Sequence, residues 1–382
     1  MATIDSNKFA QDAINAIAEK IRNLKTLNII VAGKTGVGKS TLINAIFREK
    51  LCKTGVGRPV TDHIRRITKK GIPLAIYDTR GLELGREVQD QVKREVIETI
   101  SKGMQTKDIN KTIHCIWYCI NAASNRVEPE EIRWIRELSK DNQITQVPIV
   151  VVLTQSISKK SVDAIRRLLN EENLDVVQIV PVLAEDYEID INDEKHTVKS
   201  YGLETLIQIM GETLPEELLD TLQNVQIASL SEKKRRAQAA VAAATTIAAG
   251  EGAAPIPFSD CALLIPTQLS MIVSITVIFG FDVSKSTLTA FVTSTIGPSG
   301  ATLLGRLVVS SLLKWIPGAG QIIGGAISGS TAGIITAALG EAYIGIMSLV
   351  FSGEMSIDEL NSEKGKDKMR QLFREELSKP KG

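Results

Sequence analysis

The pattern of apolar and polar positions changes once along this chain of 382 residues. Between residues 26 and 215, short β-branched apolar runs alternate with charged segments in which apolar residues recur at helical spacing. Residues 237–353 are instead dominated by Ala, Ile, Leu, Val, Gly, Ser and Thr, with few charges. Two regimes of this kind predict an α/β domain followed by an apolar all-α domain.

The first regime predicts a doubly wound α/β fold. Apolar runs with the length of strands occupy residues 27–32, 74–77, 113–120, 149–153 and 177–183. Helical patterns lie between these runs, at residues 39–48, 86–102, 129–139 and 160–170. Strands that alternate with helices indicate a mostly parallel sheet, and nearly continuous apolar strands fit burial on both faces. A further strand that contains Thr68 is expected to pair antiparallel just before Gly71.

Shorter segments flank the two domains. Apolar residues recur at helical spacing within residues 1–25, and charged residues interrupt any secretory pattern there, so we expect an N-terminal amphipathic helix. The remaining boundaries are an α/β domain at 26–215, a basic helical connector at 216–240, an apolar Gly/Ala-rich helical domain at 241–353 and a charged C-terminal helix or tail at 354–382.

Charge and composition exclude some classes of partner. Lys and Arg total 45 against 44 Asp and Glu, and aromatic residues make up only 4% of the chain. Nucleic-acid binders usually carry a basic excess, so we expect no nucleic-acid partner. Cys115 and Cys119 lie in an apolar run without further ligands on the same face, which favours buried hydrophobic residues over a metal site or a disulfide. This cysteine usage is typical of a reducing, cytoplasmic compartment.

A phosphate-binding loop follows the first predicted strand. The pattern G-x-x-x-x-G-K-[S/T] is matched in full by Gly33, Lys34, Thr35, Gly36, Val37, Gly38, Lys39 and Ser40, and Thr41 continues into a helical stretch. The glycines let backbone N–H groups turn toward phosphates, Lys39 would reach the β- and γ-phosphates, and Ser40 would offer its hydroxyl to Mg²⁺. The loop predicts binding of a nucleoside triphosphate with Mg²⁺.

Two further segments are expected to complete the phosphate and Mg²⁺ site. Asp78 ends the second buried strand and begins the D-x-x-G pattern of residues 78–81. Asp78 would hold a water of the Mg²⁺ shell, and the N–H of Gly81 would face the γ-phosphate. Thr61, in the loop between the first helix and this strand, is the leading candidate for the last Mg²⁺ ligand, with Thr54 and Thr68 as alternatives.

These motifs resemble the P-loop GTPases of the translation-factor-related class. The phosphate-binding loop is similar to the GxTGxGKS loops of septin-like, immunity-associated and immunity-related GTPases. The segments GVGRPVTDHIRR and YDTRGLE resemble an Era-like bacterial group, and PIPFSD followed by PGAGQIIGG resembles the glycine-rich C-terminal domain of unknown function in that group. The resemblance implies a GTPase domain at 26–215 with bound GTP or GDP and Mg²⁺.

The base-reading motif departs from the family pattern. The family selects guanine with an N/T-K-x-D motif, and here Thr154 fits its first position, Gln155 replaces the lysine and Ile157 replaces the aspartate. Loss of that carboxylate should weaken discrimination against adenine. After the next strand, Ala184 would offer a backbone N–H to the base, and Glu185 or Asp186 is a candidate substitute for the missing carboxylate.

The hydrolytic residues depart as well. Leu82 stands where related enzymes carry a glutamine that orients the attacking water, and Gly36 stands where potassium-activated enzymes carry an asparagine. Arg80 and Arg86 flank this loop, and either would serve as an arginine finger or remain a solvated charge. We expect slow intrinsic hydrolysis that rises on self-association, as a homodimer or larger oligomer, or with a partner.

The apolar domain contains two long uncharged tracts, at residues 261–281 and 315–340. Both are long enough to cross a bilayer, and the basic cluster at 233–236 would face anionic lipids. Pro266 and the many Gly, Ser and Thr residues also fit a buried bundle. Membrane insertion, peripheral association through 241–353 on the cytoplasmic side, and a soluble bundle all remain open.

Three functional hypotheses follow. The first is a GTP-driven switch in which the loops at 57–61 and 78–86 control the apolar helices at a membrane or in self-assembly. The second is a nucleotide-binding assembly module with little hydrolysis, which Leu82 and the altered base motif favour. The third is an NTPase of mixed base preference, because Ile157 lacks a carboxylate.

Overall fold

The chain folds into two compact units, residues 24–229 and residues 1–23 together with 230–382. We call them the α/β unit and the helical unit. The structure is a computed structural model, and it describes residues 6–48, 56–80, 82–191, 194–251, 256–257, 265–281, 326–327 and 329–379. The segment predicted as a connector divides between the units, because α8 (Glu216–Val225) belongs to the first and α9 (Leu230–Glu251) to the second.

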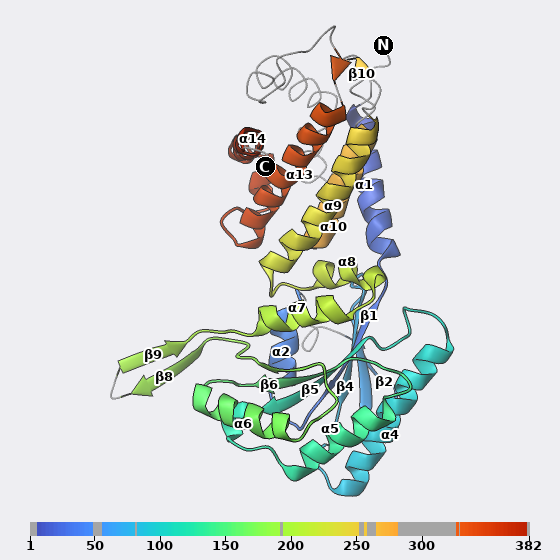
Figure 1. Ribbon diagram of the computed structural model, residues 1–382, viewed down its shortest axis with the longest axis vertical. Coiled ribbons are helices and arrows are strands. Elements are labelled where there is room, and N and C mark those ends of the chain that lie inside the picture. Colours follow the sequence, from blue (N-terminus) through green and yellow to red (C-terminus); the bar gives the residue numbers. More distant parts are fainter. Residues whose placement is uncertain are drawn as a thin grey trace. The chain divides into compact units, whose positions relative to one another are not determined.

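A seven-stranded sheet forms the centre of the α/β unit within the described residues (Figure 1). Its strands, in spatial order, are β2 (Val56–Pro59), β3 (Ile64–Thr68), β4 (Leu74–Thr79), β1 (Leu27–Ala32), β5 (Cys115–Asn121), β6 (Ile149–Thr154) and β7 (Gln178–Pro181). The pairs from β4 through β1, β5 and β6 to β7 are parallel, whereas β2–β3 and β3–β4 are antiparallel. The predicted antiparallel strand containing Thr68 is therefore present as β3.

Helices cover both faces of this sheet. One face carries α2 (Lys39–Ile46), α7 (Leu203–Thr213) and α8, and the other carries α4 (Arg86–Gln105), α5 (Pro129–Asp141) and α6 (Lys159–Glu171). We call the core between the sheet and α2, α7 and α8 the first core, and the core between the sheet and α4, α5 and α6 the second core. In β1, Ile29 and Val31 are buried in the first core and Ile30 and Ala32 in the second, so this strand needs helices on both faces of the sheet. This arrangement confirms the doubly wound, mostly parallel α/β fold that the alternation of strands and helices predicts.

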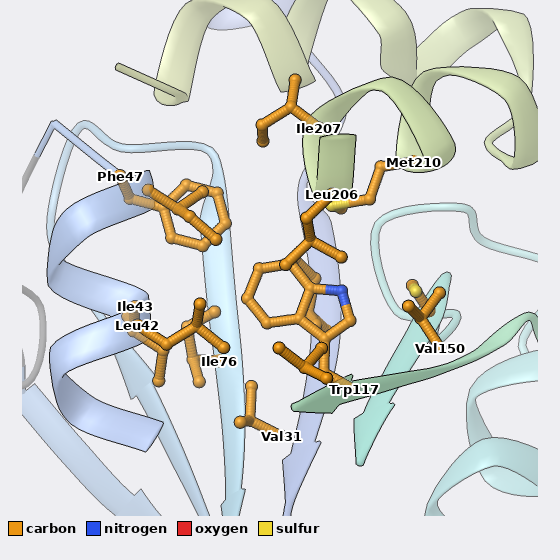
Figure 2. Packing of buried hydrophobic residues seen from close by; sticks show 14 of the residues in the cluster. Val31, Leu42, Ile43, Phe47, Ile76, Trp117, Val150, Leu206, Ile207 and Met210 are labelled. Atoms are coloured by element: carbon orange, nitrogen blue, oxygen red, sulfur yellow. The ribbon is translucent and has the colours of Figure 1, made fainter. Parts of the chain in front are cut away.

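Trp117 of β5 lies at the centre of the first core (Figure 2). Its ring stacks on Phe47 with centroids 5.9 Å apart, and Leu206 and Met210 of α7 pack over it. Cys115 and Cys119, on the same strand, are fully buried in this core, and burial raises the pKa of each thiol to about 12. Cys52 and Cys261 lie outside the described residues.

A short hairpin was not predicted. β8 (Tyr187–Ile191) and β9 (Glu194–Val198) pair antiparallel between β7 and α7 (Figure 1). Tyr187 and Ile189 alternate with Glu188 and Asp190, which is the period of a strand. Because every second residue is charged, this segment contains no continuous apolar run of the kind that indicates the other strands. A short 3₁₀ turn, η1 (Ala122–Ser124), follows β5.

The helical unit has its own core. Its elements are α1 (Ser6–Asn23), α9, β10 (Ile256–Pro257), α10 (Ile265–Phe279), β11 (Ala326–Ile327), α13 (Gly329–Phe351), η4 (Asp358–Asn361) and α14 (Glu363–Ser378). Residues from α9, α10, α13 and α14 form one cluster, so the predicted N-terminal helix and charged tail both pack in this unit. Gly340 permits close contact, since a Cβ there would lie 2.5 Å from a methyl of Val241.

The basic cluster at 233–236 does not present all of its charges to solvent. Lys233 is completely buried and donates hydrogen bonds to the carbonyl oxygens of Ile278 and Phe279, at 3.0 and 3.2 Å. Arg235 pairs with Glu232. The expectation that the whole cluster faces anionic lipids is therefore wrong for Lys233, because its ammonium satisfies the carbonyls at the C-terminal end of α10.

One helix in the described part of the chain, Thr331–Phe351 within α13, is long and apolar enough to cross a membrane by length and composition. Just over half of its most apolar window, 56%, is buried inside the protein, which is also typical of the core helix of a soluble protein. Of the two predicted tracts, 261–281 contains α10, and the end of 315–340 forms the start of α13, whereas residues 315–325 lie outside the described residues.

Candidate functional site

The phosphate-binding loop lies at the carboxyl end of β1, the central parallel strand of the sheet. Gly33, Gly36 and Gly38 all have positive φ, at 142°, 79° and 95°. Gly33 is also constrained by space, because a Cβ there would lie 2.5 Å from the carbonyl oxygen of Cys119. Glycine permits this backbone path, and α2 begins directly after it at Lys39.

A cavity of about 480 Å³ opens over this loop. It is lined by Thr35, Gly36, Gly38, Lys39, Ser40, Thr41, Asp78, Thr79, Arg80, Glu83 and Gln155. The fold thus brings together most of the predicted phosphate and Mg²⁺ residues, which come from three separate segments of the sequence. Lys39 Nζ donates hydrogen bonds to the carbonyl oxygens of Gly33 and Lys34, at 2.6 and 2.9 Å. The loop carbonyls therefore hold the ammonium of Lys39, which is one of the residues that line the cavity.

The carboxylate of Asp78 is largely buried beside the cavity, and one of its oxygens is available to a ligand. Burial raises the pKa of its carboxyl, and the charges of Lys39, Arg80 and Arg65 oppose this shift. Its Oδ1 atom is buried and has no hydrogen-bond partner among the described residues. A buried carboxylate oxygen beside a cavity requires a partner. Ser40 lines the same cavity, and a serine hydroxyl and a carboxylate are oxygen ligands that fit Mg²⁺ and its bound waters.

Thr61 stands apart from this group. It is not among the described residues that line the cavity, and it lies in the turn between β2 and β3. Its hydroxyl donates a hydrogen bond to Glu95 of α4 and accepts one from the N–H of Ile64 at 3.0 Å. Gly81 and Thr54 lie outside the described residues, so their predicted roles remain predictions.

Thr154 and Gln155, at the end of β6, donate hydrogen bonds to backbone carbonyl oxygens of the phosphate-binding loop. The hydroxyl of Thr154 lies against the carbonyl oxygens of Val37 and Ile120, donating at 3.0 Å to the second. Gln155 has a positive φ of 51°, and its Nε2 donates to the carbonyl oxygen of Gly36 at 3.3 Å. The glutamine therefore contacts the loop with an amide where the family motif places a lysine.

The residues expected to contact the base lie at the carboxyl ends of β6 and β7. Ile157 and Ala184 are partly buried. The hydroxyl of Tyr201, which sequence reasoning missed, donates to the carbonyl oxygen of Ser156 at 2.7 Å. Asp186 accepts hydrogen bonds from Lys199 Nζ and from the N–H of Ser200. These bonds join the residue before β8 to the residues after β9, at the end of the hairpin opposite its turn. They leave Asp186 poorly placed to substitute for the missing carboxylate.

Two acidic residues in the loop and helix after Asp78 were also missed. Glu83 lines the cavity, and although burial raises its pKa, hydrogen bonds from its own backbone and from Thr35 lower it overall. Burial likewise raises the pKa of Glu95, but hydrogen bonds from Thr61, His63 and Gln91 outweigh it and lower the pKa. The only sequence signal for Glu83 is its place two residues after the D-x-x-G glycine, and Glu95 gives none.

The remaining predicted residues lie around the rim. Arg80 lines the cavity, and its N–H donates to the carbonyl oxygen of His63 at 2.9 Å. Arg86 is exposed at the start of α4. Val37 is buried, and Lys34 Nζ lies 3.5 Å from Glu131 Oε2, so the side chain of Lys34 points toward α5. Leu82 is 2% exposed and packs in the second core.

Known proteins resemble both parts of the chain. Residues 28–155 match the family model described as 50S ribosome-binding GTPase, and residues 218–380 match that of a domain of unknown function, DUF697. Septin-9 of Mus musculus is 28% identical over 171 residues, covering 37% of this chain and 29% of that protein. The tRNA modification GTPase MnmE of Desulforamulus reducens is 31% identical over 150 residues, covering 38% and 29%. The chain thus spans under a third of the length of these curated relatives.

Solved structures are more distant. Toc33 from Arabidopsis thaliana, in complex with Mg²⁺ and GMPPNP, shares 18% identity with this chain at a TM-score of 0.29. The alignment covers 57% of this chain and 95% of that one. A likeness at this level transfers no property of the neighbour.

Proposed function

We propose that this chain, in which residues 28–155 form a P-loop GTPase domain, is a slowly hydrolysing GTP- and Mg²⁺-dependent switch that acts through its helical unit. The observation that carries the proposal is the shared cavity, where Lys39 and Ser40 at the start of α2 meet Asp78 near the end of β4. A triphosphate is the ligand that needs a lysine, a hydroxyl and a carboxylate together with free backbone N–H groups.

The residues around the cavity support binding of the phosphates and Mg²⁺. Backbone N–H groups of residues 33–40 would receive the phosphate oxygens, and Lys39 would exchange its bonds to the loop carbonyls for bonds to the β- and γ-phosphates. Ser40 and Asp78 would hold Mg²⁺ directly or through water, with Thr61 as the proposed third residue. When bound, Mg²⁺ neutralises charge on the β- and γ-phosphates.

The choice of GTP rests on the family match rather than on the base-reading loop. Ile157 offers no carboxylate to the guanine edge, and Asp186 is already engaged in the hairpin. Thr154, Gln155 and the N–H of Ala184 would then supply orientation more than discrimination. We therefore expect a preference for GTP over ATP of less than about 100-fold, because a single missing carboxylate leaves donors of the base unpaired.

Slow hydrolysis follows from the position of Leu82. Its side chain is buried in the core formed by α4, α5 and the sheet, so it neither orients water nor faces the cavity. Arg80 lines the cavity and is the candidate for stabilising charge on the transferred phosphoryl group, in the same chain or across a homodimer. We expect intrinsic turnover below about 10⁻² per second, as for related enzymes without an arginine supplied by a partner.

The helical unit is the proposed output of the switch. It would act at the cytoplasmic side of a membrane, through residues 241–353, or in nucleotide-dependent self-assembly. The apolar length of Thr331–Phe351 supports the first output. The burial of much of that helix supports the second, because a helix already packed in a core has less apolar surface to offer to lipid.

A second candidate function is a nucleotide-binding assembly module with little hydrolysis. Leu82 is the specific observation that favours it, because its burial removes the usual water-positioning side chain. Turnover measured over a hundredfold range of protein concentration separates the two. The switch predicts a specific activity that rises with concentration, whereas the assembly module predicts a flat and negligible rate.

Titration calorimetry with GTP, GDP and ATP in the presence of Mg²⁺ tests the binding site itself. Lys39→Ala should weaken GTP binding by at least about 100-fold, because it removes the ammonium group that would contact the β- and γ-phosphates. The matched control is Lys34→Ala in the same loop, whose ammonium faces Glu131, and it should change affinity by less than about threefold. Equal losses in the two variants would contradict the assignment.

A further inference from the structure

The turn that joins β2 to β3 is attached to helix α4 by hydrogen bonds to the carboxylate of one residue, Glu95. Glu95, in the third turn of α4, accepts hydrogen bonds from the Thr61 hydroxyl and, at 3.2 Å, from the N–H of His63. The Nδ1 atom of His63 lies 3.0 Å from the other carboxylate oxygen, and Gln91 Nε2 donates to that oxygen at 3.1 Å. The Glu95 side chain is only 12% exposed, so these donors replace most of its solvent.

The turn itself is closed by further bonds. Val60 and Thr61 donate their N–H groups to the carbonyl oxygen of Ile64, at 2.8 and 3.3 Å. The carbonyl oxygen of His63 accepts from the N–H of Arg80, so the turn is also fixed to the loop that follows Asp78. Both segments that would respond to nucleotide are therefore joined in this conformation.

This arrangement holds the Thr61 hydroxyl, the group that a metal would need, within the turn. The hydroxyl donates to Glu95 and accepts from the N–H of Ile64, and Thr61 lies outside the described lining of the phosphate cavity. These two bonds use the proton and one of the two lone pairs of the hydroxyl, and a metal ligand must direct a lone pair at the ion. Because Thr61 is not among the described residues that line the cavity with Ser40 and Asp78, it would have to leave this turn to bind Mg²⁺ there.

We propose that Glu95 is a positioning residue that withholds Thr61 from the Mg²⁺-triphosphate site and releases it only when the triphosphate is bound. The inference rests on the proposed function, because it takes Thr61 as a Mg²⁺ ligand. The contact favours the free and diphosphate-bound forms, since a ligand that engages Thr61 must break it whereas one that does not leaves it intact. Glu95 thus lowers the affinity for the triphosphate relative to the diphosphate, compared with a protein in which Thr61 is free to bind Mg²⁺.

Glu95→Gln keeps the size of the side chain and removes its charge. Hydrogen bonds to an ionised acceptor are roughly twice as strong as neutral ones, so the variant should loosen the turn without deleting it. We expect its affinity for Mg²⁺ with a non-hydrolysable GTP analogue to rise about fivefold, and its affinity for Mg²⁺-GDP to stay within about twofold of wild type. A residue that only stabilised the fold would not shift the two affinities differently.

The experiment is a double-mutant cycle on the full chain, followed by calorimetry with both nucleotides. The variants are Glu95→Gln, Thr61→Val and the two combined. Thr61→Val alone should weaken the triphosphate analogue, and in its background Glu95→Gln should give no gain. The matched control is Glu98→Gln on the same helix, because Glu98 is 57% exposed and pairs with Lys102. It should leave both affinities unchanged.

Hydrogen exchange gives a readout that does not depend on nucleotide. Amides of residues 60–64 in the free protein should exchange faster in Glu95→Gln than in wild type, and at the wild-type rate in Glu98→Gln. An unchanged ratio of triphosphate to diphosphate affinity, a gain that persists without Thr61, or unchanged exchange would each overturn the inference. If wild-type protein binds neither nucleotide, both the proposed function and this inference fail. If wild-type protein binds both nucleotides and Glu95→Gln leaves the two affinities unchanged, only the inference fails.

Discussion

At the scale of single residues, buried polar atoms without partners have two different meanings in this protein. Asp78 Oδ1 is unpaired among the described residues and borders the phosphate cavity, so a ligand can satisfy it. His114 Nε2 is unpaired in the same sense but lies in the interior, where it only costs free energy. The opposite ring nitrogen, Nδ1, accepts the N–H of Asn28 at 3.0 Å and so attaches the start of β1 to the segment before β5.

His114 predicts a pH dependence of stability. Burial lowers its pKa from 6.5 to about 4, a shift that a backbone hydrogen bond at Ile109 partly opposes. Between these values the unfolded chain binds the proton and the folded chain does not, so stability rises with pH across this window and falls on acidification. The free energy of unfolding should decrease by about 2 kcal/mol from pH 7 to pH 5 on this account alone.

The measurement is urea unfolding of wild type and His114→Gln at pH 7 and pH 5. The variant should be less stable than wild type at pH 7, because the acceptor for Asn28 is displaced, and its stability should fall by about 2 kcal/mol less between the two pH values. Parallel losses in both proteins would assign the acid sensitivity to other groups.

At the scale of elements, the position of the phosphate-binding loop depends on the packing of α2 against the sheet. Leu42 and Ile43 of α2 and Phe47 at its end lie in the first core, and Phe47 stacks on Trp117 of β5 (Figure 2). The indole therefore links the helix that follows the loop to the strand that lies beside β1. Its Nε1 is buried without a partner among the described residues, so the ring contributes by its shape and area.

Trp117→Ala should lower the free energy of unfolding of the α/β unit by about 3–5 kcal/mol, as expected for removal of a large core aromatic. Trp117→Phe should cost less than about 2 kcal/mol, because it keeps an aromatic ring against Phe47 and removes the unpaired N–H. Denaturant unfolding of the two variants gives the comparison. A phenylalanine variant as unstable as the alanine variant would mean that the indole makes a contact that this packing does not explain.

At the scale of the whole molecule, the hydrophobic cores of the two compact units are separate: the α/β unit has one on each face of its sheet, and the helical unit has its own. The phosphate-binding loop belongs to the α/β unit, and the close contact at Gly340 belongs to the helical unit. A ligand or a substitution that acts within one unit is expected to change the stability of that unit first, and any effect on the other unit measures the coupling that a switch requires.

Scanning calorimetry should therefore resolve two unfolding transitions. GTP with Mg²⁺ at 100 times its dissociation constant should stabilise the α/β unit by about 2.7 kcal/mol and raise its transition. Gly340→Leu should lower the other transition, because even a Cβ at this position would lie 2.5 Å from Val241. A single transition that nucleotide and Gly340→Leu both displace would contradict the presence of independent cores.

The features determined by the sequence alone are those in which neighbouring residues act together. The spacing of Gly33, Gly38 and Lys39 after an apolar run requires a turn between a strand and a helix, and Asp78 at the end of the next such run falls at the same sheet edge. The GTPase resemblance and the doubly wound sheet were both confirmed for this reason. The charged hairpin of β8 and β9 was missed because apolar periodicity carries little information where both faces are exposed.

Only the tertiary structure decided which distant groups meet. Thr61 and Glu95 are 34 positions apart, and no local pattern indicates that the hydroxyl of one is bound by the carboxylate of the other. Lys233 has the sequence context of a solvated charge, yet it is buried because α10 presents two carbonyl oxygens to it. The free energy of a charged or hydrogen-bonding group depends on the partners and solvent around it, and these are fixed by packing between elements rather than by the neighbouring residues in the chain.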